Sequence, residues 1–324
     1  MEMKHVLFHV AGLPVSLYAV CIVASLAVGL LALYLNQRRE GLREETTEIF
    51  ALLALPLGLL GARAFYCLAR LSLYMEIGAG SIFRLWEGGY ALWGVIGGAA
   101  LAAVLTAKIT HQSALKLLDT MAAPGALVIA LSRMAEMANG EGIGMEVWDP
   151  MFQRFPFAVF NADYEVWFWA VFVLEALVAA AIACVLLSRK LCAMAPGSRA
   201  KAFVVFYCSA QILLESLRRD GFLRWLFVRV SQLTAVLVLA ALMFWALYRW
   251  VMAPADKRMA PRTLIVNWVI FVVGVGVSIG MEFAVDKSAY MPVWLCYTLM
   301  AICCVAFGWT SYQLILKGVA AEEA

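Results

Sequence analysis

The chain has 324 residues, of which 65% are hydrophobic and only 15% are charged, and its mean hydropathy is +0.87. A soluble globule carries about 25% charged residues, so this composition excludes a secreted or cytosolic globule, and the abundance of apolar and aromatic residues excludes disorder. The net charge of +3 is too small and too dispersed to indicate nucleic-acid binding. The composition predicts a polytopic membrane protein.

Apolar runs along the chain give the predicted helices. A helix that crosses the roughly 30 Å hydrocarbon core needs about 20 largely apolar residues. Nine runs of this kind predict an all-α bundle with spans near 13–35, 49–71, 88–108, 115–138, 164–187, 202–217, 225–250, 264–285 and 290–316. The run at 202–217 is short, and the run at 115–138 is interrupted by Asp119, Pro124 and Arg133. We expect both to be functional irregularities rather than ideal lipid-facing helices.

The basic residues between the runs predict the orientation. The loops 36–48, 108–116, 188–201 and 249–263, together with the C-terminal tail, carry fourteen Lys and Arg residues. The loops on the opposite side carry nine, and four of these cluster at 218–229. Because cytoplasmic loops carry the excess of Lys and Arg, the count predicts an outside N-terminus and a cytoplasmic C-terminus.

Small residues and cysteines point to packing rather than to chemistry. Glycines four residues apart let helix backbones approach closely in lipid, and three pairs have this spacing: Gly94 and Gly98, Gly140 and Gly144, and Gly276 and Gly280. The eight cysteines contain no C-x-x-C motif and nearly all lie in apolar runs. They are interpreted as small apolar filler, so no disulfide framework, metal site or cofactor is predicted.

Charged residues inside the apolar runs are the first candidates for function, because an ionised side chain is costly to remove from water. These residues are Arg63, Asp119, Arg133, Glu136, Glu165, Glu175 and Glu215. Arg133 and Glu136 are three residues apart, so their side chains can meet on a helix. The alternative is that the set pairs only to hold the bundle together.

The arginines indicate the class of ligand. A guanidinium stays charged in any environment and matches phosphate in a bidentate way. Arg63 and Arg133 therefore suggest a site for an anionic lipid headgroup. The aromatic residues Trp86, Tyr90 and Trp93 suit the interfacial depth at which headgroups lie.

Seven fragments, in order over roughly residues 8–250, resemble the bacterial prolipoprotein diacylglyceryl transferase family. They are L-P-V-S-L-Y-A-V with Tyr18, G-A-R-A-F-Y (61–66), W-E-G-G-Y-A-L-W-G-V-I-G-G (86–98), S-R-M-A-E-M-A-N-G-E-G-I-G (132–144), D-Y-E (163–165), Y-C-S-A-Q-I-L-L-E-S-L-R (207–218) and S-Q-L (231–233). Asp119 matches a family aspartate. The family's seven helices end near residue 250, so residues 1–250 resemble its membrane domain and residues 251–324 add a two-helix hairpin.

The resemblance implies a multi-pass transferase of the bacterial inner membrane, which moves diacylglycerol from phosphatidylglycerol to a lipobox cysteine thiol in lipoprotein biosynthesis. Its partners are then phosphatidylglycerol or a related anionic phospholipid, and preprolipoprotein signal peptides. Matching by position retains a set of family residues: Tyr18, Arg133, Asn139, Gly140, Glu141, Gly144 and Glu215. Arg133 is expected to bind the headgroup phosphate with support from Arg63. Glu141 and Asn139 are expected to orient the loop within the fragment 132–144, which we call the signature-like loop.

Three positions depart from the family pattern: Trp93 replaces a histidine, Glu136 an asparagine and Gln211 an arginine. A thiol attacks as thiolate, and tryptophan cannot take its proton as histidine could. Gln211 cannot stabilise charge that gathers on a leaving phosphate. Glu136 can pair with Arg133 and occupy the donors that a phosphate needs.

These departures leave three functions open. The first is a diacylglyceryl transferase with an altered active site. The second is a catalytically degenerate paralogue that binds anionic lipid or lipoprotein signal peptides. The third is a small transporter or channel component, against which the lack of an inverted repeat counts.

Overall fold

A computed structural model of the chain describes residues 6–10, 13–85, 88–162, 164–221, 223–225, 228–287 and 291–319. Within these residues, eight helices are long and apolar enough to cross a membrane. They are α1 (Leu17–Arg39), α2 (Thr46–Ala69), α4 (Leu92–Ile109), α5 (Ala114–Ala135), α8 (Ser198–Leu217), α9 (Val230–Met252), α10 (Pro261–Lys287) and α11 (Val293–Lys317). The predicted all-α polytopic membrane fold is confirmed.

The predicted span at 164–187 needs a correction. Its helix, α6 (Val171–Leu186), has only 16 residues, because the preceding segment Val166–Ala170 forms strand β5. That segment, V-W-F-W-A, is rich in the β-branched and aromatic residues that favour strands. Glu165, expected inside the membrane, is instead exposed in a turn with a φ of 55°. The count of nine spans therefore stays a prediction.

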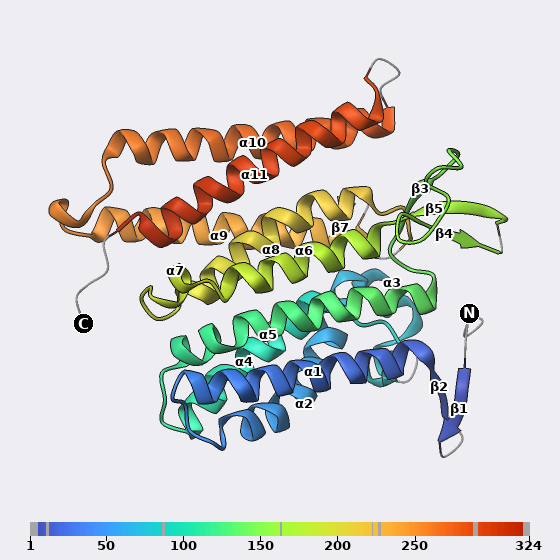
Figure 1. The fold of residues 1–324 in the computed structure, drawn as a ribbon, viewed down its shortest axis with the longest axis horizontal. Helices are drawn as coiled ribbons and strands as arrows, with labels where there is room; N and C mark the ends of the chain where they lie inside the picture. The colour runs from blue at the N-terminus through green and yellow to red at the C-terminus, as the bar shows by residue number, and fades with distance from the viewer. Residues whose placement is uncertain are drawn as a thin grey trace.

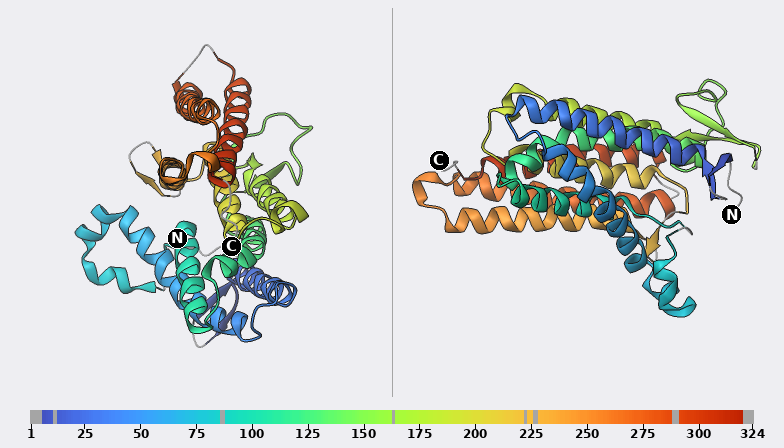
Figure 2. Two further views of the ribbon diagram at one scale, coloured as in Figure 1. Left: turned by 90° about the vertical axis from the view of Figure 1, so that its left-hand side faces the viewer. Right: turned by 90° about the horizontal axis from the view of Figure 1, so that it is seen from below.

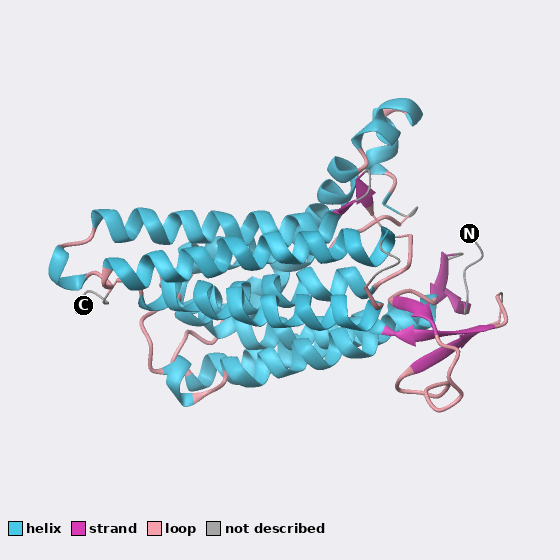
Figure 3. Ribbon diagram, turned by 90° about the horizontal axis from the view of Figure 1, so that it is seen from above, coloured by secondary structure: helices cyan, strands magenta, loops and turns pink. Residues whose placement is uncertain are grey.

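The long helices lie side by side in three groups. Figure 1 shows α1, α2, α4 and α5 on one side, α10 and α11 on the other, and α6, α8 and α9 between them. All the strands gather at one end of the bundle, which we call the strand end (Figure 3). Short helix α3 (Leu71–Ile77) and the 3₁₀ turn Ala79–Phe83 project from the same end (Figure 2). The opposite end holds α7 (Arg189–Cys192) and the turn Ala255–Lys257.

Three small antiparallel sheets make up the strand end. Strands β1 (Val6–Val10) and β2 (Leu13–Ser16) form one, and β6 (Arg224–Trp225) and β7 (Val228–Arg229) form another. The third has the order β3-β5-β4, with β3 at Ile143–Glu146 and β4 at Ala158–Asn161. This third sheet connects the end of α5 to the start of α6, so it holds both helix ends in a fixed relation.

The three glycine pairs have different outcomes. Gly94 and Gly98 do bring α4 against α2, since a Cβ at either would lie 2.1–2.2 Å from a backbone oxygen of α2. Gly140 and Gly144 do not share a helix: Gly140 adopts a left-handed φ of 66° after α5, and Gly144 lies in β3. A Cβ at Gly276 or Gly280 would meet open space, so the packing expected of that pair is wrong within the described residues.

Helix α8 begins earlier than its apolar run. The predicted span starts at residue 202, whereas the helix starts at Ser198. Asp119 of α5 explains the difference, because its carboxylate accepts hydrogen bonds from the backbone amides of Gly197 (2.7 Å) and Ala200 (2.8 Å). An acceptor of this kind satisfies amide groups that a helix start leaves without partners. The first turn can therefore include Arg199, which hydropathy alone would exclude.

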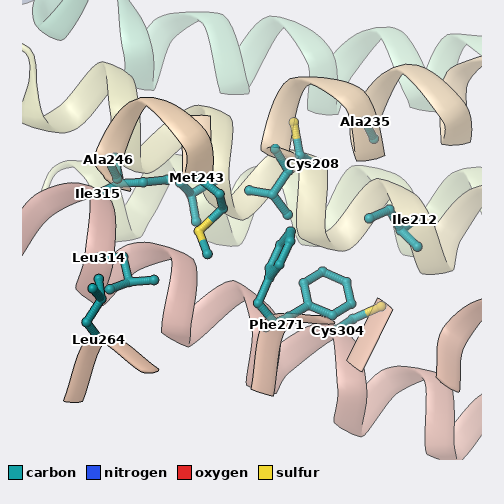
Figure 4. Close-up of a cluster of buried hydrophobic side chains, with 13 residues drawn as sticks. Cys208, Ile212, Ala235, Met243, Ala246, Leu264, Phe271, Cys304, Leu314 and Ile315 are labelled. Carbon is teal, nitrogen blue, oxygen red and sulfur yellow. The ribbon is translucent and has the colours of Figure 1, made fainter. Parts of the chain in front are cut away.

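The added hairpin is packed firmly onto the rest of the bundle. Its buried side chains Phe271, Cys304 and Phe307 contact α8 and α9, which contribute Val205 and Leu239 among others. Figure 4 shows side chains from both pairs of helices meeting in one apolar layer. Since close packing between helices replaces the hydrophobic effect inside lipid, this layer fixes α11 against the end of α8, next to the site described below.

Candidate active site

A buried network of charges lies at the strand end, where four helices converge. Arg133 lies in the last turn of α5, Glu175 in α6, Glu215 in the last turn of α8, and Arg229 immediately before α9. Glu136, Arg218 and Asp220 come from the connecting segments. Three guanidinium groups are at most 9% exposed. Burial of this kind is tolerated only when the charges are paired.

Arg133 forms the pair that the sequence predicts. Its guanidinium donates to Glu136 three residues later, and its Nε lies 3.5 Å from Glu175 Oε2. The three-residue spacing places both side chains on one face of the helix end. Two carboxylates thus occupy the donors of Arg133, as a phosphate would.

Arg218 joins the two carboxylates to a third. Its Nη1 lies 3.1 Å from both Glu136 Oε2 and Glu175 Oε2. Its Nε and Nη2 both donate to one carboxylate oxygen, Asp220 Oδ2, at 3.0 and 2.6 Å, and such charge-assisted hydrogen bonds are stronger than neutral ones. Arg218 therefore fixes the end of α8 to the signature-like loop after α5.

Arg229 and Asp220 complete the network. Arg229 donates to Asp220 Oδ1 at 3.0 Å and to the backbone oxygens of Arg218 and Asp220 at 2.8 and 2.7 Å, and its Nη1 lies 3.5 Å from Glu215. Asp220 Oδ2 also accepts from the Gly142 amide at 2.9 Å. Although burial acts to raise it, the nearby Arg218 guanidinium holds the pKa of Asp220 below its ordinary value.

The network carries an excess of negative charge. Four carboxylates, Glu136, Glu175, Glu215 and Asp220, face three guanidinium groups. One buried oxygen of Glu175, Oε1, has no hydrogen-bond partner within the described part of the chain. Glu141 adds a fifth carboxyl beside the network, and burial together with the Glu136 charge raises its pKa to about 7. Positive charge for an anionic ligand is therefore present but already neutralised.

The other two altered positions lie on the same side of the network. Gln211 is buried in α8 and donates to Glu215 Oε1 at 2.9 Å. Trp93 of α4 packs its ring 5.9 Å from that of Tyr207, one turn before Gln211. An arginine at 211 would bring the guanidinium count to four, equal to the four carboxylates of the network, and an asparagine at 136 would remove one of those carboxylates.

Of the remaining predicted residues, Tyr18, Gly144 and Asn139 lie in the elements around the charge network. Tyr18, in the first turn of α1, is within electrostatic range of Glu136, Glu141 and Arg133. Gly144 is buried in β3, where a Cβ would lie 2.8 Å from Val171. Asn139 is exposed at the end of the 3₁₀ turn Glu136–Asn139.

Arg63 contacts a separate set of groups. Its Nε and Nη2 donate to the backbone oxygens of Ile82 and Ser81 at 3.0 and 2.8 Å, and its Nη1 donates to Gly88. It therefore fixes Ser81, Ile82 and Gly88 against α2. Trp86, which the sequence places at the interface, and Asp163 of the D-Y-E fragment lie outside the described residues.

Several network members are not in the predicted site. Asp220 and Arg229 are absent from it. Glu175 enters the sequence analysis only as one of the charges inside the apolar runs, and Arg218 only within the fragment 207–218 and the basic cluster. A signal was available, because four arginines cluster at 218–229 on the side of the membrane that carries fewer basic residues. The structure shows why two of these arginines, Arg218 and Arg229, are there: they neutralise buried carboxylates.

Comparison with known proteins bears on this arrangement. The sequence profile of the family described as prolipoprotein diacylglyceryl transferase matches residues 5–248. The chain belongs to this family. Among bacterial relatives named phosphatidylglycerol–prolipoprotein diacylglyceryl transferase, one from Shouchella clausii is 32% identical over 73% of this chain and 87% of its own length. Others from Bacillus velezensis and Streptococcus suis are 26% and 28% identical over 78% and 77% of this chain, and each is covered over 94% of its length.

Membership of the family defines the setting of the site. The protein is a multi-pass protein of the bacterial inner membrane. The family match includes every member of the charge network, from Arg133 to Arg229, and ends within α9. Helices α10 and α11 lie beyond it.

Proposed function

We propose that this protein is a phosphatidylglycerol–prolipoprotein diacylglyceryl transferase with an altered active site at the charge network. In the reaction, the lipobox thiolate sulfur forms a bond to the glyceryl carbon. The carbon–oxygen bond to the phosphate breaks, and glycerol phosphate leaves with the electron pair. The observation that supports the proposal most directly is the meeting of three buried guanidinium groups beside the signature-like loop.

Each predicted residue has a role in this proposal. Arg133 binds the headgroup phosphate, which it can do in a bidentate way once Glu136 moves aside. Arg63 acts from a distance, because its contacts hold the backbone at Ser81, Ile82 and Gly88. Asn139, Gly140 and Gly144 shape the loop that carries Glu136 and Glu141.

The thiol proton also needs an acceptor, and Trp93 offers none. Glu141 is a partly exposed carboxyl whose pKa is about 7, close to the value at which a general base is most effective. Tyr18 and Glu215 line the same region from α1 and α8. We therefore assign the proton to Glu141 and the binding of the donor lipid to Arg133.

The second candidate is a catalytically degenerate paralogue that binds anionic lipid or a lipoprotein signal peptide without transfer. One observation favours it: Glu136 already occupies Arg133, and a phosphate that displaces it leaves the buried Glu136 carboxylate with Arg218 as its remaining ion-pair partner among the described residues, which carries an energetic cost. Both candidates predict slow or absent standard transfer by the native chain. They differ in whether any transfer takes place.

The test is transfer of labelled diacylglycerol from phosphatidylglycerol to a lipobox peptide by purified protein. Lipid that co-purifies with the protein is identified by mass spectrometry in parallel. Slow transfer that is lost in Arg133→Ala supports the transferase. Retained phosphatidylglycerol without transfer supports the degenerate paralogue. Absence of both would refute the role of Arg133, and complementation of a transferase-depleted strain provides the matching test in cells.

We also propose that the strand end faces outward and that the C-terminus is cytoplasmic, with α10 and α11 inserted as two spans. The excess of Lys and Arg in the loops at the other end supports this orientation. It places the charge network on the outer side, where a translocated lipobox thiol is available. A C-terminal reporter fusion that is active only outside the cell would refute it.

A further inference from the structure

A pocket of about 540 Å³ lies at the strand end between the transferase-like bundle and the added hairpin. Its walls include Leu174 and Leu177 from the first turns of α6, Trp169 from β5, Leu217 at the end of α8, and Trp294 and Tyr297 from the first turn and a half of α11. Because the family match ends at residue 248, the wall from α11 is specific to the part of the chain beyond it.

The pocket opens toward the side of the bundle that a bilayer covers. Leu174, Leu177 and Trp294 are 42%, 63% and 68% exposed although all three line it. Around the spanning helices the medium is lipid, so lipid chains reach this opening directly. Its volume lies within the range of about 300–1,000 Å³ typical of small-molecule sites.

The Tyr297 hydroxyl is a polar group of the pocket lining, and it contacts Arg219, the residue after Arg218 of the charge network. The Tyr297 hydroxyl donates to the backbone oxygen of Ser216 at 3.2 Å and accepts from Arg219 Nη2 at 3.3 Å. Arg219 follows Arg218, and its backbone amide donates to Ile143 of β3 at 2.8 Å. An apolar pocket at the depth of the first helix turns, with a guanidinium in contact with one of its lining side chains, has the polarity of an anionic phospholipid.

We propose that this pocket holds one acyl chain of an anionic phospholipid, whose phosphate lies at Arg219. A peptide helix is too large for it: two turns of helix with side chains, at a diameter of about 10 Å, fill roughly 850 Å³. An extended peptide would bury amide groups against apolar walls at a cost of about 1–3 kcal/mol each. The proposal concerns lipid retention through the added hairpin and does not depend on transfer taking place.

Shortening the pocket tests the proposal. Of the α6 residues that line the pocket, Leu177 lies furthest from the start of the helix at the strand end. Leu177→Trp should therefore block the space that the end of a long acyl chain occupies and leave room for a short one. Leu237→Trp on α9 is the control, because Leu237 is 59% exposed and is not among the residues that line the pocket. Retention of dioleoyl- and dilauroyl-phosphatidylglycerol is measured by native mass spectrometry of the full chain.

We expect Leu177→Trp to lower retention of the dioleoyl lipid at least tenfold relative to the dilauroyl lipid, and the control to change neither. Equal retention of both lipids by native protein and Leu177→Trp would refute the pocket as an acyl-chain site. Replacing Arg219 by Gln in a chain that also carries Arg133→Gln and Glu136→Gln, which removes the proposed donor-lipid site, should remove the preference for phosphatidylglycerol over phosphatidylcholine. A preserved preference would refute the headgroup contact.

A phosphatidylglycerol with a diazirine in its acyl chain identifies the occupant independently. Labelled peptides should come from the first turns of α6 and α11. Labels spread evenly over α1, α9 and α10, or a label displaced by a hydrophobic signal-peptide segment, would overturn the proposal. Because this readout is a covalent mark and not turnover, it separates failure of the pocket from failure of the transferase assignment.

Discussion

Helix α5 carries a buried charged residue near each end, and the two sites are built in opposite ways. Asp119, near the start, is 5% exposed and each of its oxygens accepts a backbone amide of the α8 start. Arg199 beside it is paired with Glu40 at 2.8 Å. Arg133, near the other end, belongs to a network in which carboxylates outnumber guanidinium groups.

We propose that this difference separates a structural charge from a functional one. At Asp119 every oxygen has a backbone donor, as expected for a carboxylate at a helix start. At Arg133 the pairing is incomplete, since Glu175 Oε1 has no hydrogen-bond partner among the described residues. Stability alone gives no reason to keep such a network, because apolar residues often replace buried ion pairs without loss. The predictions below test this distinction.

Restoring the family residues at the strand end should have the largest effect. Trp93→His, Glu136→Asn and Gln211→Arg together free Arg133, add a positive charge and supply an imidazole. A proton acceptor and a charge-stabilising donor are each worth about 100-fold or more. We expect the triple variant to transfer diacylglycerol at least about 100-fold faster than the native chain.

Single reversions serve as the controls for that experiment. Each single reversion should raise the transfer rate by much less than a third of the triple variant's gain in activation free energy, because groups that act as a unit are non-additive. Adding Arg133→Ala to the triple variant should abolish the gain. Rapid transfer by the native chain would show that Glu136 does not block Arg133, and Trp93 would then be a harmless substitution.

Removing Arg133 should have the next largest effect. In a Leu177→Trp background, which blocks the separate pocket beside α11 for long chains, Arg133→Ala should abolish the remaining retention of dioleoyl-phosphatidylglycerol while the protein remains inserted in the membrane, as measured by carbonate extraction and lipid mass spectrometry. Because Arg133→Ala also leaves Glu136 and Glu175 short of a partner, the double variant Arg133→Gln with Glu136→Gln is the matched control for folding. Normal lipid retention by the double variant would refute the headgroup role.

Neutralising Asp119 should affect folding and leave the strand end intact. Asp119→Asn keeps the size of the side chain but loses one acceptor oxygen, so it should cost about 1–3 kcal/mol of stability. Thermal unfolding in detergent measures this loss. Phosphatidylglycerol retained per folded molecule should stay at the native level, and a selective loss of lipid would show that the two ends of α5 are not independent.

The smallest effect should be a pH dependence that originates at Glu141. Folding raises its pKa from 4.5 to about 7, so the folded protein binds this proton more tightly than the unfolded chain. The stability contributed by protonated Glu141 is therefore full at low pH and falls as pH rises from 4.5 to about 7.

Thermal unfolding on both sides of this window measures the effect. Glu141→Gln should remove the part of the pH dependence that falls within it, because an amide does not titrate there. Phosphatidylglycerol retention should also be higher at low pH and fall as pH rises, since protonation of Glu141 lowers the negative charge near Arg133. An unchanged pH profile in Glu141→Gln would assign the titration to another carboxyl.

The sequence alone predicts the membrane class, the places of the long helices and the Arg133–Glu136 pair. These follow from local properties: the length of an apolar run sets a span, and three residues along a helix set a contact. It misplaces Glu165, because strand pairing of β5 with β3 and β4 overrides the apolar run that contains it. It also misses the early start of α8, which depends on Asp119, 78 residues before Gly197.

Only the tertiary structure decided what surrounds Arg133. Glu175, Arg218, Asp220 and Arg229 lie 42 to 96 residues further along the chain, and no spacing rule relates them to it. Packing of α5, α6, α8 and α9 brings them within ion-pairing distance, and the low dielectric of the interior then strengthens the attraction within each pair. The sequence by itself determined which charges lie within apolar runs, because composition is local, but the fold placed one of them, Glu165, in an exposed turn. Which charges neutralise one another depended on the fold, because a charge buried away from water is stabilised by whatever lies next to it in space.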